Sequence, residues 1–119
     1  EAFGPDGPNS IHLCGDATHL FPTIRDELKV NAFDTGFPVD HGGLRRTLGP
    51  DVFIHGGPHV EFLRGRTPAE VREETRRILE SGVMEGGKFV LREANNLAPG
   101  TPPENVAAMH EACREFGQY

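Results

Sequence analysis

The sequence is poor in the residues that mark several large classes of protein. It has no tryptophan, one tyrosine and two cysteines among 119 residues, and acidic residues outnumber basic ones, for a formal net charge of −6. Two cysteines cannot supply a disulfide framework, so we expect reduced thiols and a cytoplasmic location. An acidic chain without a basic tract is expected to bind neither nucleic acid nor an anionic membrane surface.

Long apolar runs are also missing. No run approaches the roughly 20 residues of a membrane-spanning helix, and no charged stretch precedes an apolar one, so we expect neither a membrane anchor nor a signal peptide. What is present is an ordinary share of hydrophobic (36%) and charged (25%) residues, with 15 glycines and 10 prolines. Length and composition predict a single domain over residues 1–119, in which residues 1–10 form a leading loop.

Short apolar segments alternate with amphipathic ones along the chain. The apolar segments predict strands, and they lie at 11–14, 29–33, 52–55 and 88–91. The amphipathic segments predict helices, and they lie at 18–28, 41–48, 67–82 and 101–117. This alternation predicts an α/β fold with parallel strands, either an open doubly wound sheet or four units of an eight-unit barrel. No G-x-G-x-x-G motif follows a strand, which removes the main support for a dinucleotide-binding domain.

Two Thr-Pro steps mark expected helix starts. Thr67 is predicted to cap a helix that has Pro68 at its first position, and Glu70 completes a capping box. The segment from Thr101 to Glu104 repeats this pattern, so the same kind of cap is predicted there.

Polar side chains follow each predicted strand, at the edge where parallel α/β folds bind and react with their ligands. The set comprises His12, Cys14, Asp16, Asp34, His55, His59, Glu93, Asn95 and Asn96. His12 and Cys14 are two residues apart, so they share one face of a strand and could chelate a zinc ion. The alternative is a buried cysteine beside a hydrogen-bonded histidine.

The other strand-end residues have less specific chemistry. Asp34 could hold a cation or transfer a proton, or it could only shape a turn. His55 and His59 flank a Gly-Gly-Pro turn and could act as acid, base or ligand, or simply line a polar rim. We assign candidate catalytic roles to Asp34, His59 and Asp16, and candidate substrate contacts to His55, Asn95 and Asn96.

Several of these motifs, taken in order, resemble the uroporphyrinogen decarboxylase (URO-D) superfamily, in the branch that contains the cobalamin-dependent methyltransferases. The motifs are His12-Leu13-Cys14-Gly15-Asp16, Phe33-Asp34-Thr35, the run from Leu48 to Gly57, Gly65 to Val71, and Leu97 to Tyr119. The resemblance implies a TIM (β/α)8 barrel of which this chain supplies the last four units, and so decides between the two architectures.

The resemblance also implies chemistry. In the methyltransferase branch, a zinc ion held by the H-x-C pair and a later cysteine activates a thiol, which exchanges a methyl group with a corrinoid. His12 and Cys14 match that pair, Asn95 stands where the later cysteine is expected, and Glu93 is the carboxylate that would serve as third ligand. The expected cofactors are therefore zinc and a corrinoid as partner substrate, on a corrinoid protein or as a small molecule. The alternative branch decarboxylates uroporphyrinogen in porphyrin biosynthesis and uses no metal.

Four strands cannot close a barrel, and both edges of their sheet stay open. We therefore expect either a homodimer or completion of the barrel by an N-terminal half. A third interpretation is a non-catalytic half-barrel that only self-associates.

Overall fold

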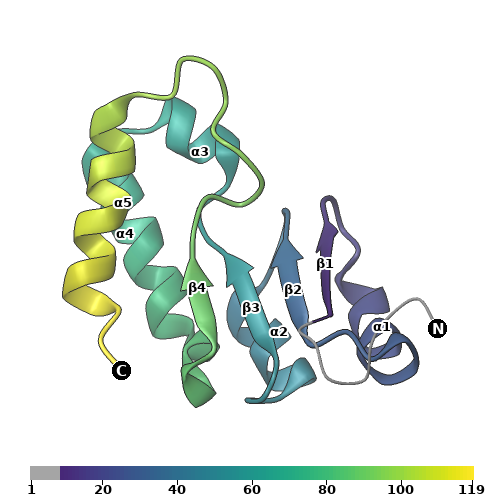
Figure 1. Cartoon of the computed structure of the whole chain (residues 1–119). Helices are drawn as coiled ribbons and strands as arrows, with labels where there is room; N and C mark the ends of the chain where they lie inside the picture. Colours follow the sequence, from purple (N-terminus) through teal and green to yellow (C-terminus); the bar gives the residue numbers. More distant parts are fainter. Residues whose placement is uncertain (1–8) are drawn as a thin grey trace.

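Four short strands form one parallel sheet in the computed structural model, which describes residues 9–119 (Figure 1). The strands are β1 (Ser10–Leu13), β2 (Ala32–Thr35), β3 (Phe53–Gly56) and β4 (Phe89–Leu91), in the order β1-β2-β3-β4. The main helices are α1 (Phe21–Leu28), α2 (His41–Leu48), α4 (Pro68–Ile78) and α5 (Pro103–Phe116). The predicted α/β fold with four parallel βα units is confirmed. None of the described helices is both long and apolar enough to cross a bilayer.

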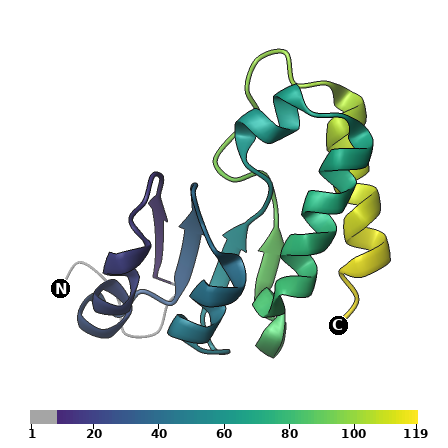
Figure 2. The same cartoon turned by 180° about the vertical axis from the view of Figure 1, so that it is seen from behind.

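The two faces of the sheet differ in what covers them. Side chains alternate along a strand, so Phe33 and Ile54 point to one face, where they are fully buried in the main core. Their neighbours Phe53 and Val90 belong to the other face and are 41% and 44% exposed. Figure 2, seen from behind, shows α2 lying across the sheet, whereas in Figure 1 no helix lies in front of the strands. One face of the sheet is therefore left open, as the inner face of a partial barrel is.

A buried arginine fixes the amino-terminal ends of the strands. Arg45 on α2 is 1% exposed and donates to the carbonyl oxygens of Val83 (2.8 Å), Gly49 (2.9 Å), Val52 (2.6 Å) and Lys88 (2.8 Å). One guanidinium thus joins α2 to the segments that lead into β3 and β4. This contact sets the positions of two strands whose opposite ends carry the site.

Some predicted boundaries are corrected by the structure. The second strand begins at Ala32 rather than at 29, because Lys29 ends α1 in a left-handed conformation (φ 57°). A short helix, α3 (Val60–Gly65), was missed, and the side chain of His59 caps it. Helix α4 ends at Ile78 and continues as a π-helical turn, η2 (Leu79–Val83).

Shorter helical turns complete the described chain, η1 (Thr18–Leu20) before α1 and η3 (Glu85–Gly87) before β4. The capping box of Thr67 and Glu70 is present as predicted. The repeat of that cap before α5 is wrong, since the N-cap is Pro102 and the Thr101 hydroxyl donates to the Ala98 carbonyl. Residues 1–8 of the predicted leading loop lie outside the described residues, and Ser10 already belongs to β1.

Candidate active site

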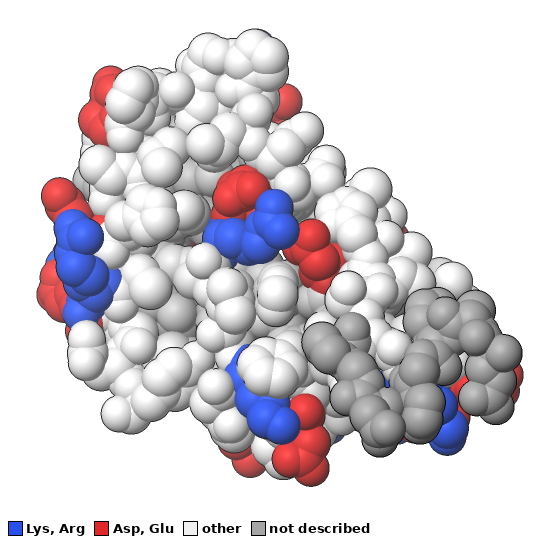
Figure 3. All heavy atoms as spheres, in the orientation of Figure 1, with Lys and Arg blue, Asp and Glu red and all other residues white. Residues whose placement is uncertain are grey.

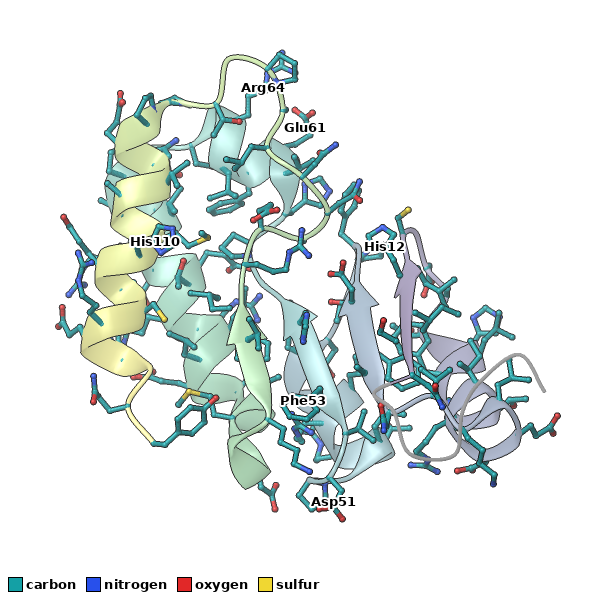
Figure 4. All side chains as sticks on the ribbon, in the orientation of Figure 1. His12, Asp51, Phe53, Glu61, Arg64 and His110 are labelled. Atoms are coloured by element: carbon teal, nitrogen blue, oxygen red, sulfur yellow. The ribbon has the colours of Figure 1, made fainter. Side chains whose placement is uncertain are left out.

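The register of the sheet places three of the predicted strand-end residues in one row. His12 on β1 pairs with Asp34 on β2, Asp34 pairs with His55 on β3, and His55 pairs with Val90 on β4. Residues paired in register point to the same face, here the open one. The row therefore presents two imidazoles and a carboxylate side by side, and Figure 4 shows His12 where β1 ends.

Asp34 is the centre of the charged contacts in this row. Its Oδ2 accepts from His12 Nδ1 at 2.9 Å and from Arg92 Nη1 at 3.0 Å. Arg92, which directly follows β4, also donates to Glu93 Oε1 at 2.9 Å and to the Asn95 carbonyl at 3.4 Å. The hydrogen bond with Glu93, together with the charge of Asp34, raises the pKa of Arg92, so its guanidinium stays charged. A single network thus joins β1, β2 and the end of β4.

One atom of this network has no partner. Asp34 Oδ1 is buried and accepts no hydrogen bond within the described part of the chain. A buried carboxylate oxygen without a donor is costly, since most buried polar atoms in folded proteins are hydrogen-bonded. Such an atom at a strand end is a natural acceptor for an N–H or O–H group of a ligand.

The surface around the network carries few other charges. Figure 3 shows basic atoms flanked by acidic atoms above the ends of the strands, on a face that is otherwise mostly uncharged in its centre. The side chains of Asp34, Glu93 and Arg92 are 21%, 23% and 35% exposed. Partial removal from water strengthens electrostatic contacts at this position relative to ion pairs on the periphery.

The remaining predicted residues are more dispersed. Cys14 is exposed just after β1, and the exposed Asp16 beyond it accepts from the neighbouring Thr18 hydroxyl at 3.4 Å. Asn96 is exposed. Asn95 has a φ of 151°, which is unusual for a residue with a side chain and marks local strain.

His59 has a structural task in addition to any chemical one. Its Nδ1 accepts from the backbone N–H of Glu61, and its ring packs against Phe37 at a tilt of 53°, with centroids 3.6 Å apart. Both rings line a hollow of about 200 Å³ that also reaches His41, on the helix side of the β2 and β3 ends. His41 is 7% exposed, and burial, aided by the charge of Arg77, lowers its pKa to about 4.

The predicted zinc ligands are not gathered into a site. Among residues 9–119, no three His, Cys, Asp or Glu side chains lie close enough together to hold a metal ion. The His12–Asp34 contact does resemble the carboxylate that orients a zinc-bound histidine. Glu93, however, is held by Arg92, and Asn95 offers a neutral amide. The donor set of the described residues therefore does not fit a three-ligand zinc site.

Arg92 is the functional candidate that sequence reasoning missed. Its position could have revealed it, because Arg92 is a charged residue that directly follows β4. Its partner Asp34 lies 58 positions earlier, and that contact depends on the register of three strands.

Residues 1–116 match the uroporphyrinogen decarboxylase (URO-D) family, and the chain belongs to that family. It is 32% identical over 110 residues to a methylated-thiol–coenzyme M methyltransferase of Methanosarcina mazei, a match that covers 91% of this chain and 28% of the relative. It is 26% identical over 111 residues to a uroporphyrinogen decarboxylase of Thermosynechococcus vestitus, covering 93% of this chain and 31% of that one.

A solved structure supports the architecture. A methyltransferase from Methanosarcina mazei superposes with a TM-score of 0.74 over 95% of this chain and 32% of that chain, at 20% identity. The fold is thus that of part of a TIM-barrel-like protein. The chain spans less than a third of the length of each of these proteins.

Proposed function

We propose that this chain forms the C-terminal half of the barrel of a methyltransferase-type enzyme of the URO-D family. The enzyme transfers a methyl group between a corrinoid or a methylated small molecule and a thiol. The observation that carries the proposal is the His12–Asp34 pair at the open, strand-end face. The methanogen methyltransferase, at 32% identity against 26% for the decarboxylase, supports methyl transfer over decarboxylation.

The geometry assigns a task to His12. Next to a carboxylate, the imidazole is most stable with its proton on Nδ1, where it donates to Asp34 Oδ2. Nε2 is then a free base. In the direction of thiol methylation, Nε2 takes the proton of the thiol, the sulfur attacks the methyl carbon, and the donor leaves with the electron pair of the broken bond. Asp34 stabilises the imidazolium that forms, as the carboxylate does in other His–Asp pairs.

Asp34 Oδ1 and the strand-end amides supply binding. The unpartnered oxygen accepts a hydrogen bond from an N–H or O–H group of the substrate, which relieves the cost of its burial. The backbone of Asn95 is strained, and its carbonyl accepts from Arg92. This contact fixes the backbone from which the Asn95 side chain extends. His55, between Asp34 and Val90 in the register, lines the same face.

The open face needs a partner. We propose that a further half-barrel, from an N-terminal part of the polypeptide or from a second copy, covers Phe53 and Val90 and completes the site. The short length of this chain relative to its relatives supports the first arrangement. A corrinoid protein would then approach the carboxyl-terminal ends of the strands in a cytoplasmic enzyme.

The test is a methyl-transfer assay on the purified full-length protein. Methylcobalamin and a panel of small thiols are the probes, and demethylation of the corrinoid is followed by absorbance. We expect turnover in the wild type and its loss in His12→Gln, because glutamine cannot act as the base. Conversion of uroporphyrinogen to a decarboxylated product, without methyl transfer, would refute the proposal and establish the decarboxylase alternative.

A further inference from the structure

The contacts of Arg92 explain why the expected zinc site is not assembled. Two carboxylates, Asp34 and Glu93, lie at the end of the sheet with less than a quarter of each side chain exposed. Carboxylates removed from water need a cation nearby, because burying an uncompensated charge is costly. Either a bound metal ion or a protein side chain can supply that positive charge.

We infer that Arg92 is the resident cation of this site and takes the place of a metal ion there. Its guanidinium donates through Nη1 to Asp34 and through Nη2 to Glu93. The planar fork of arginine suits such bridging of two acceptors, and its charge does not depend on pH in the physiological range. The inference rests on the strand-end location of the proposed site and does not depend on the reaction catalysed there.

Three features of the site act together against zinc. Glu93, the carboxylate expected to join His12 and Cys14 as third ligand, is bound to Arg92. Arg92 and His12 donate to the same oxygen of Asp34, so a metal ion on His12 would lie near a fixed positive charge. Asn95 brings no negative charge to the site.

Arg92 thereby acts as a positioning residue. Through the Asn95 carbonyl and Asp34, it joins the loop after β4 to β2. It also orients the Asp34 carboxylate, so that Oδ2 accepts from Arg92 and Oδ1 remains available to accept from a ligand. A site neutralised by its own side chain in this way suits a thiol that is deprotonated by His12 rather than by coordination to a metal.

Zinc uptake tests the inference without any knowledge of the substrate. The full-length wild type, Asn95→Cys, Arg92→Gln and the double variant are loaded with excess zinc chloride and desalted, and metal is measured by mass spectrometry. Cobalt(II) loading adds a spectroscopic readout of thiolate ligation. We expect no stoichiometric zinc in the wild type. The double variant should bind zinc at least about tenfold more tightly than Asn95→Cys, in line with the effect of neighbouring groups on metal affinity.

Several outcomes would overturn the inference. These are stoichiometric zinc in the wild type that is lost in His12→Ala, equal affinity of Asn95→Cys and the double variant, or a folded double variant that binds no zinc. Arg92→Met, which keeps the stem without the charge, replaces Arg92→Gln if that variant does not fold. A negative methyl-transfer assay combined with the expected zinc pattern would refute the proposed function and leave this inference standing.

Discussion

Asp34 and His41 show two ways in which this protein keeps a titratable residue out of water. Two donors, His12 Nδ1 and Arg92 Nη1, reach one oxygen of the partly buried Asp34. Nε2 of His41 has no hydrogen-bond partner among residues 9–119, and burial, with the charge of Arg77, lowers the pKa of His41 to about 4 from 6.5. The first arrangement creates a site, whereas the second makes folding sensitive to acid.

The lowered pKa of His41 predicts a loss of stability in mild acid. Between pH 6.5 and about 4 the unfolded chain binds a proton that the folded chain does not. The contribution of neutral His41 to the free energy of unfolding is thus complete above pH 6.5. It is lost as the pH falls towards 4, by about 3 kcal/mol over that range. Urea unfolding at several pH values measures it. His41→Phe is the control, and an equally steep pH dependence in that variant would contradict the assignment.

Two glycines allow a matched test of packing at the strand ends. A Cβ on Gly57 would overlap the carbonyl oxygen of Arg92, whereas one on Gly65 would meet nothing within 4 Å. Gly57→Ala should therefore cost about 1–3 kcal/mol of unfolding free energy, the usual range for overpacking, and Gly65→Ala should cost none of it. Thermal unfolding compares the two variants. Equal melting temperatures would show that the end of β4 is not held against β3 as described.

At the scale of elements, local chemistry decided what could be predicted from sequence. Helix α2 has the predicted bounds, because Asp40 precedes it as a cap and Gly49 ends it. The start of β2 was displaced because Lys29 adopts a left-handed conformation, and α3 was missed because a histidine caps it. Composition reveals neither feature. The strand positions of His12, Asp34 and His55 were predictable from the pattern of apolar segments. Their partners were not, because Arg92 meets Asp34 only through the register of the sheet.

The capping box of α4 gives a prediction at this scale. The Thr67 hydroxyl accepts from the backbone N–H of Glu70 at 3.3 Å, and a Glu70 oxygen accepts from the Thr67 N–H at 2.9 Å. Thr67→Ala should lower the free energy of unfolding by about 1 kcal/mol, and Thr67→Ser should retain most of it. Chemical denaturation measures both variants. A serine variant as unstable as the alanine variant would argue against the cap.

At the scale of the whole molecule, the open face of the sheet leaves apolar side chains in contact with water. Phe53 and Val90 are more than 40% exposed, and β1 and β4 each leave one edge unpaired within the described sheet. We expect the 119-residue chain, expressed alone, to self-associate and to bind a hydrophobic dye. Phe53→Asp should shift it towards the monomer in light scattering. A monomeric wild type that binds no dye would contradict a role for this face in completing a barrel.

In the proposed methyl-transferring enzyme, Asp34 and His12 together deprotonate the thiol. The most direct measurement is kcat for methyl transfer by full-length Asp34→Asn, with Asp51→Asn as the matched control because Asp51 is exposed and lies before β3, at the end of the strand opposite the site. We expect a fall of about 100-fold or more for Asp34→Asn, the scale of general base catalysis, and an unchanged kcat for Asp51→Asn. Equal kcat values in the two variants would contradict it.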